Sequence, residues 1–178
     1  MSNVNIKRAV ENIRANTTVY TPVVEMIVNA IQAIDEANRV DGKVSIRAQR
    51  SSQTEMDGRL PDVSSFEIED NGIGFTDAHR NSFDTLYTDL KIKEGGKGFG
   101  RLTGLKYFED VHIRSVYRKD HSFKCRKFSM GKDNDIIVHE KVAVSEKQES
   151  GTVVSLSALK KKGAFDKKIQ TIARNLVE

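Results

Sequence analysis

The chain has 178 residues, 38% of them hydrophobic, so it is about one domain long and can bury a substantial core. Its 29 basic and 25 acidic residues leave a net charge of +4 spread along the chain, which permits nucleic acid as a partner but does not indicate it. The single cysteine, Cys125, excludes an intramolecular disulfide, and no signal peptide or membrane span is evident, so we expect a cytoplasmic protein.

The elements follow a helix-then-strand order. An amphipathic helix is predicted from Tyr20 to about Asn38, because apolar residues recur there at spacings of three and four and Thr21-Pro22 supplies a start. The elements expected after it are a strand at 43–49, a loop at 50–63, a strand from Phe66 to Asp70, helices at about 77–86 and 101–107, strands at 111–118, 122–130, 135–144 and 151–157, and a helix near 164–177. This order predicts an α+β fold with helices on one face of a mainly antiparallel sheet.

The strand that ends at Asp70 delivers a carboxylate into a glycine-rich turn. Phe66 and Ile68 alternate with glutamates, as expected when one sheet face is buried. Gly72 and Gly74 allow positive φ or close backbone approach, so the Asp70 side chain can face a pocket. Taken alone, the segment is equally well read as an ordinary Asn-Gly hairpin.

The first helix carries a second polar set. Glu25 and Asn29 are four residues apart and therefore project from one helical face. Both are costly to bury without partners, and Asn29 lies within the apolar run. An amide oxygen together with substrate phosphates would suit Mg²⁺, which prefers oxygen ligands. The alternative is a solvated Glu-Asn pair on the polar edge of the helix.

A third set is the glycine cluster at residues 94–101, where Lys97 and Arg101 lie among four glycines. Such a loop before a helix N-terminus can cradle phosphates with its backbone N–H groups. A flexible linker fits the interleaved Lys, Phe and Arg poorly. A dinucleotide fingerprint would have to follow a hydrophobic strand directly, and a P-loop would need Gly-Lys-Ser/Thr. The four histidines show no metal-ligand spacing, and no serine lies in a nucleophile elbow.

Four motifs in order resemble the GHKL ATP-binding superfamily: Glu25-x-x-x-Asn29, Asp70-Asn-Gly-Ile-Gly74, Gly96-Lys-Gly-Phe-Gly100 and Gly151-Thr152. Members of that superfamily include DNA gyrase B subunits, heat-shock chaperones of the ninety-kilodalton class, histidine kinases, MutL repair proteins and MORC proteins. The resemblance spans most of the chain and is greatest to the chaperone and MORC branch. It implies the Bergerat fold, a two-layer α+β sandwich with helices on one face of a mixed, mainly antiparallel sheet.

The resemblance also implies roles for individual residues. Asp70 would accept a hydrogen bond from the adenine amino group with support from Thr152, Asn29 would ligate Mg²⁺, and Glu25 would be the general base. The full set of implied nucleotide-binding residues is Asn29, Asp70, Gly72, Gly74, Gly96, Lys97, Gly98, Phe99, Gly100, Arg101 and Thr152. Two residues depart from the family pattern. Gln32 stands where many relatives have Asp, and Asp89 stands where a Thr-Ser-x-Lys run of some relatives has Ser.

We therefore expect a Mg²⁺-dependent ATPase whose lid closes over ATP and drives a conformational change or homodimerisation. Residues 1–20 are expected to be an arm or first helix, and residues 21–178 a single ATP-binding domain of a longer protein. Hydrolysis should be slow in isolation, because relatives commonly receive a Lys or Arg from a following domain. The alternatives are a histidine kinase catalytic domain, disfavoured by the short segment before the first motif, and a module that binds ATP without significant turnover, disfavoured by Glu25.

Overall fold

The computed structural model of the chain describes residues 5–13, 17–52, 60–84 and 100–177. Its helices are α1 (Ile6–Glu11), α2 (Thr21–Glu36), α3 (Asp77–Asp84), the 3-10 helix η1 (Gly100–Leu102), α5 (Thr103–Tyr107) and α6 (Ile169–Val177). Its strands are β1 (Val44–Arg50), β2 (Val63–Asp70), β3 (Phe108–Lys119), β4 (Ser122–Met130), β5 (Ile137–Val144) and β6 (Gly151–Leu159).

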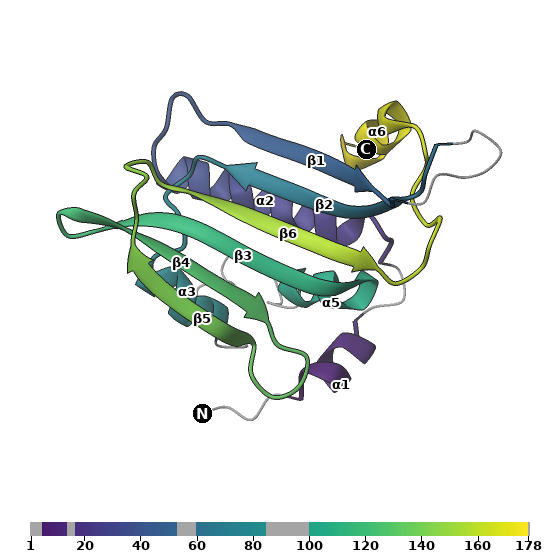
Figure 1. Cartoon of the computed structure of the whole chain (residues 1–178), viewed down its shortest axis with the longest axis horizontal. Coiled ribbons are helices and arrows are strands. Elements are labelled where there is room, and N and C mark those ends of the chain that lie inside the picture. The colour runs from purple at the N-terminus through teal and green to yellow at the C-terminus, as the bar shows by residue number, and fades with distance from the viewer. Residues whose placement is uncertain (1–4, 14–16, 53–59, 85–99, 178) are drawn as a thin grey trace.

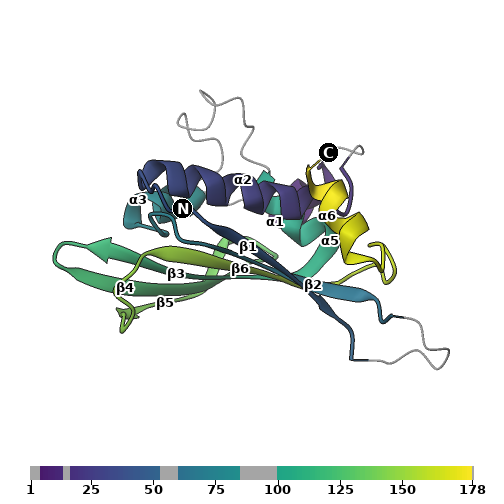
Figure 2. The same ribbon diagram turned by 90° about the horizontal axis from the view of Figure 1, so that it is seen from above.

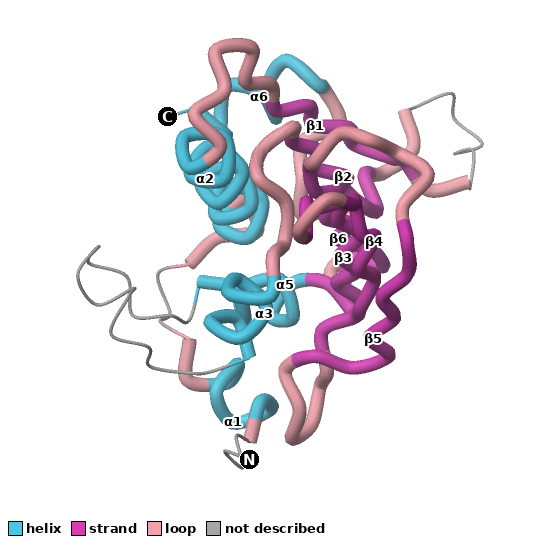
Figure 3. Tube along the Cα trace, turned by 90° about the vertical axis from the view of Figure 1, so that its left-hand side faces the viewer, coloured by secondary structure: helices cyan, strands magenta, loops and turns pink. Residues whose placement is uncertain are grey.

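The molecule has two layers, a six-stranded sheet and a layer of helices (Figure 1). The labelled helices all lie on the same side of the sheet, which leaves its other face uncovered by helices (Figures 2 and 3). This arrangement confirms the predicted α+β sandwich. None of the described helices is long and apolar enough to cross a membrane.

The strand order is β1-β2-β6-β3-β4-β5, and every pairing among these strands is antiparallel. The last strand in the chain, β6, lies between β2 and β3. Asp70 on β2 therefore pairs with Thr152 on β6, which pairs in turn with Ser115 on β3. Three residues that are far apart in sequence thus meet in one row across the sheet.

The core fills the space between α2 and the sheet. Val23 and Met26 on α2 are buried, as are Phe66 and Ile68 on β2. These residues follow the helical and strand periodicities that the sequence shows, so each element buries one face. Complete burial of such a side chain typically stabilises the fold by about 1.5–3 kcal/mol.

A second group of apolar contacts fixes the C-terminal segment. The ring of Phe165 lies 4.7 Å from that of Phe66 and 4.9 Å from that of Tyr20. The helix expected near 164–177 begins only at Ile169, because the preceding residues turn at Gly163, with φ +69°, and then anchor Phe165 in the core. The expected start of the last helix was therefore wrong by about five residues.

At the N-terminal end, residues 6–11 form the short helix α1. The side chain of Asn5 caps it by accepting a hydrogen bond of 2.8 Å from the Arg8 N–H. Ile6 is buried, and its N–H donates to the carbonyl of Asp133, which ties α1 to the β4–β5 connection.

Candidate functional site

Asp70 ends β2 with a half-buried carboxylate. Its Oδ1 accepts a hydrogen bond of 2.8 Å from the Gly72 N–H. Burial raises the pKa of Asp70 from 3.8 to about 6, against the lowering effect of hydrogen bonds from the backbone of Gly72 and Thr152. The carboxylate is thus held in place while remaining costly to ionise, which is typical of side chains at functional sites.

The turn after Asp70 depends on its two glycines. A Cβ at Gly72 would lie 2.5 Å from the carbonyl carbon of Ala33 on α2, and the Ile73 N–H donates to the Ala33 carbonyl at 2.9 Å. Gly74 has φ +80°, and a Cβ there would lie 2.1 Å from the Val116 carbonyl oxygen. The turn is therefore wedged between α2 and β3 at distances that only glycine permits.

Asn71 joins this turn to the connection between α2 and β1. Its Oδ1 accepts from the Lys43 N–H at 2.7 Å, and its Nδ2 donates to the Asp41 carbonyl at 2.9 Å. The Asn-Gly pair does not form a hairpin, because the chain continues from here into α3. The hairpin alternative raised by the sequence is therefore wrong.

Ser115 connects the turn to β6, and sequence reasoning missed it. Its hydroxyl accepts a hydrogen bond of 2.7 Å from the Phe75 N–H and lies 3.0 Å from the Thr152 hydroxyl and from the Gly151 carbonyl. The serine is 1% exposed. A serine between Ile113 and Tyr117, at an inward position of an alternating strand, was the available signal.

Arg126 was also missed. It is 4% exposed, and its Nη1 donates to the carbonyls of Phe75 and Thr76 at 2.6 and 2.8 Å. Its Nε lies 3.0 Å from a carboxylate oxygen of Glu140. An arginine at an inward position of β4 was the signal, because a buried cation requires partners.

Asp77, the first residue of α3, completes this arginine's contacts. It forms ion pairs with Arg126 and with Lys119, the latter at 2.7 Å. Lys119 and Arg126 lower the pKa of Asp77 to about 2. The residues that follow Gly74 are therefore fixed to the sheet through both backbone and side-chain contacts.

One face of α2 carries the second predicted set. Glu25, Asn29 and Ala33 follow at intervals of four residues, so they form a line along the helix, which we call the α2 line. Glu25 and Asn29 are half-buried, and neither side chain has a hydrogen bond or ion pair with another described residue. Gly72 packs on Ala33 at one end of the line. At the other end, a Cβ at Gly100 would lie 2.3 Å from Oε2 of Glu25.

Arg101, the other described residue of the glycine cluster, is buried. Its Nη1 donates to the Ser82 and Phe83 carbonyls at the end of α3, and its guanidinium lies 5.3 Å from the centre of the Phe83 ring. Burial lowers the pKa of Arg101. Gly96, Lys97, Gly98 and Phe99 lie outside the described residues, as does the run at 88–91.

Residues 16–162 match the family model described as histidine kinase-, DNA gyrase B- and HSP90-like ATPase. The chain belongs to this GHKL ATPase family. Asp70, Thr152 and the α2 line all fall within the matched residues, and membership implies that the GHKL domain binds ATP. Among curated proteins, no sequence matches the chain.

Solved structures agree with this fold. The ATPase region of Saccharomyces cerevisiae topoisomerase II matches with a TM-score of 0.57 and 16% identity. The same region bound to ICRF-187 (dexrazoxane) matches with a TM-score of 0.58 and 16% identity. Each match covers 88% of this chain but only 43% of the topoisomerase chain. At this identity the likeness shows the fold of the GHKL domain alone.

Proposed function

We propose that this domain binds ATP together with Mg²⁺ and hydrolyses the γ-phosphate slowly. The observation that carries the proposal is the α2 line, which joins the Asp70 turn at Ala33 to Glu25 beside Gly100. Eight residues of helix separate the two ends, or about 12 Å at 1.5 Å per residue. An extended nucleotide fits this span, with its base at the Asp70 end and its phosphates at the Glu25 end.

At the base end, Asp70 would accept a hydrogen bond from the adenine amino group. The backbone N–H of Gly72 fixes the carboxylate, and Thr152, itself positioned by Ser115, stands beside it on the neighbouring strand. Gly74 would serve the base end by letting the turn pack against β3, where the Val116 carbonyl fills the space that a Cβ would take. An ionised carboxylate accepts hydrogen bonds only, so it favours adenine, whose exocyclic group donates, over guanine, whose corresponding group accepts.

At the phosphate end, Glu25 would act as general base on the attacking water. The half-buried carboxylate has no partner among the described residues, so it is available to accept a proton. The side-chain amide of Asn29, one helical turn later, also has no partner among the described residues and would ligate Mg²⁺. The described residues contain no group of three His, Cys, Asp or Glu side chains suited to a metal. A Mg²⁺ ion at this site would therefore be held mainly by phosphate oxygens and water, and the ion would offset the negative charge of the phosphates.

The glycine cluster completes the proposed site. Gly96, Gly98 and Gly100 would form a lid over the phosphates, with Lys97, Phe99 and Arg101 in or beside it. Lid closure would drive a conformational change or dimerisation of the whole protein. A Lys or Arg from a following domain would then raise the hydrolysis rate.

The test separates binding from turnover. Glu25→Ala should keep ATP affinity within about threefold while lowering hydrolysis by at least about 100-fold, the usual contribution of a general base. Glu146→Ala, which removes an exposed carboxylate from the connection between β5 and β6, is the matched control and should leave both quantities unchanged. If Glu25→Ala retains wild-type turnover, Glu25 is not the base. If the wild-type protein binds ATP without measurable turnover, the module is a nucleotide binder only.

A further inference from the structure

The uncovered face of the sheet carries a line of cations. Arg114 on β3 pairs directly with Lys127 on β4, which pairs with Lys141 on β5. Directly paired residues point to the same side of a sheet, and adjacent strands lie about 4.8 Å apart. All three side chains are exposed. Arg114 and Lys127 alternate along their strands with the buried residues Ser115 and Arg126, so the three lie on the face away from the core. We call these three residues the basic row.

No ion pair within the described part of the chain includes a member of the basic row. None of its three members forms an ion pair or hydrogen bond through its side chain with another described residue. On the same face of β1 and β2, in contrast, Arg47 lies 2.8 Å from Glu67 and 2.9 Å from Glu69. Like charges placed directly opposite each other destabilise a sheet. Folding therefore gains nothing from the basic row, which fits a role in binding an anion.

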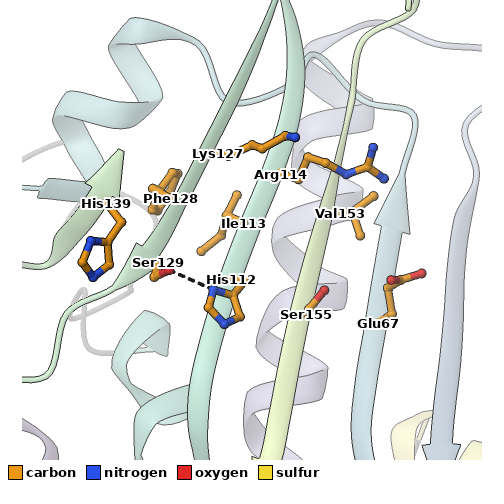
Figure 4. Close-up of a pocket in the computed structure, with 10 residues that line it drawn as sticks. All are labelled: Glu67, His112, Ile113, Arg114, Lys127, Phe128, Ser129, His139, Val153 and Ser155. Atoms are coloured by element: carbon orange, nitrogen blue, oxygen red, sulfur yellow. Dashed lines mark hydrogen bonds between the residues drawn. The ribbon is translucent and has the colours of Figure 1, made fainter. Parts of the chain in front are cut away.

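A shallow hollow beside the row adds further polar groups (Figure 4). Arg114 and Lys127 line it, together with His112, Ser129 and Ser155. Glu67 also lines it, but its carboxylate is paired with Arg47 at 2.8 Å. His112 Nδ1 lies 2.8 Å from the Ser129 hydroxyl. Cations accompanied by hydroxyl and imidazole groups are the side chains that contact phosphate oxygens in nucleic-acid complexes.

The composition of this face disfavours a protein partner. The exposed large hydrophobic residues on the sheet are Ile46, Val142 and Val144. They pair with Ile68, Arg126 and Lys124, which places them on the opposite face or at the edges. Stable protein interfaces require a buried apolar or aromatic centre. The described residues of the face around the basic row offer no such centre.

Single-stranded nucleic acid is also disfavoured. Sites for single strands stack bases on exposed aromatic rings, and no Phe or Tyr among the described residues is exposed. We propose that the basic row binds the phosphodiester backbone of a nucleic-acid duplex, without reading its sequence. This binding is independent of the proposed ATP site, which lies on the helix side of the sheet.

The experiment measures binding of a fluorescein-labelled 20-base-pair DNA duplex by anisotropy at 50–200 mM KCl. The triple variant Arg114→Gln, Lys127→Gln, Lys141→Gln is compared with a control that removes the same charge from another surface, Lys161→Gln, Lys162→Gln, Lys168→Gln. The control lysines are exposed. The basic-row variant should bind at least about tenfold more weakly, and the slope of log K against log salt should fall by about 2.7, or about 0.9 for each phosphate that the variant no longer neutralises. The control should bind within about threefold of wild type.

Two further measurements make the outcome decisive. Removing the repulsion should leave the melting temperature of the basic-row variant equal to wild type or higher, so weaker binding cannot be attributed to unfolding. The single variant Lys127→Gln should lower the salt slope by about 1. The proposal is overturned if both triple variants weaken binding equally, if wild type binds no duplex at 50 mM KCl, or if poly-glutamate at equal charge displaces the duplex.

Discussion

Replacing Asp70 with asparagine should change how the stability of the unliganded protein depends on pH. Burial raises the pKa of this carboxyl from 3.8 to about 6 in the folded chain. As pH rises from 4 to 7, the unfolded chain releases the Asp70 proton first, while the folded chain still holds it. Unfolding is therefore favoured progressively across this window, and the cost is complete above about pH 7. The asparagine of the variant has no titrating proton, so the variant lacks this contribution of residue 70 to the pH dependence of stability.

The magnitude follows from the two pKa values. The interval between 3.8 and about 6, at about 1.4 kcal/mol per pH unit, corresponds to about 3 kcal/mol. At pH 4 the carboxyl of the unfolded chain is already more than half ionised, so about 2.4 kcal/mol of this total falls between pH 4 and pH 7.5. The free energy of unfolding of the wild type should therefore fall by that amount relative to that of Asp70→Asn. Other carboxyl groups titrate in both proteins, and their contributions cancel in the difference.

Urea unfolding followed by circular dichroism at pH 4, 5, 6 and 7.5 measures this difference. Asp120→Asn is the matched control, because Asp120 is an exposed turn residue with φ +53°, a conformation that asparagine also accepts. The control keeps Asp70 in place, so it should retain the fall in the free energy of unfolding that Asp70→Asn removes. If the wild-type and Asp70→Asn profiles run parallel across this range, Asp70 is solvated in the folded protein and the reasoning fails.

Two further predictions concern the turn after Asp70 and are checked by urea unfolding. Gly74→Ala should destabilise the protein by at least about 1 kcal/mol more than Gly163→Ala. Both glycines have positive φ, but only a Cβ at residue 74 would meet a carbonyl oxygen, that of Val116. Equal destabilisation by the two variants would contradict the close approach of the turn to Val116. Arg126→Ala should cost about 1.5–3 kcal/mol, because the Phe75 and Thr76 carbonyls lose a charged donor. Lys119→Ala, at an exposed ion pair, should cost at most about 1 kcal/mol. Similar costs for the two variants would show that the Arg126 network does not hold the turn.

The elements that the sequence predicts well are those with strong local patterns. The helical spacing around Glu25 and the alternation that leads to Asp70 are both properties of short segments, and the structure has a helix and a strand there. The glycines at 72 and 74 likewise indicate close approach through their residue type alone. Local steric requirements and amphipathic periodicity are sufficient for such features.

Features that depend on strand order could not be predicted in this way. Ser115 reaches Thr152 only because β6 lies between β2 and β3, and that pairing joins residues 37 positions apart. The packing of Gly100 on Glu25 joins α2 to a segment far along the chain. Local propensity carries no information on such contacts, so buried polar residues at inward strand positions are the main hint that sequence provides.

Calorimetric titration with ATP and with GTP, in Mg²⁺, tests the central claim that Asp70 holds the adenine end of a nucleotide site. The wild-type protein should bind ATP about 10- to 100-fold more tightly than GTP, because the guanine carbonyl would leave the Asp70 carboxylate facing an acceptor. Asp70→Asn should narrow this preference, since its amide can donate to that carbonyl. Equal affinity of the wild type for the two nucleotides, or no binding of ATP, would contradict the account.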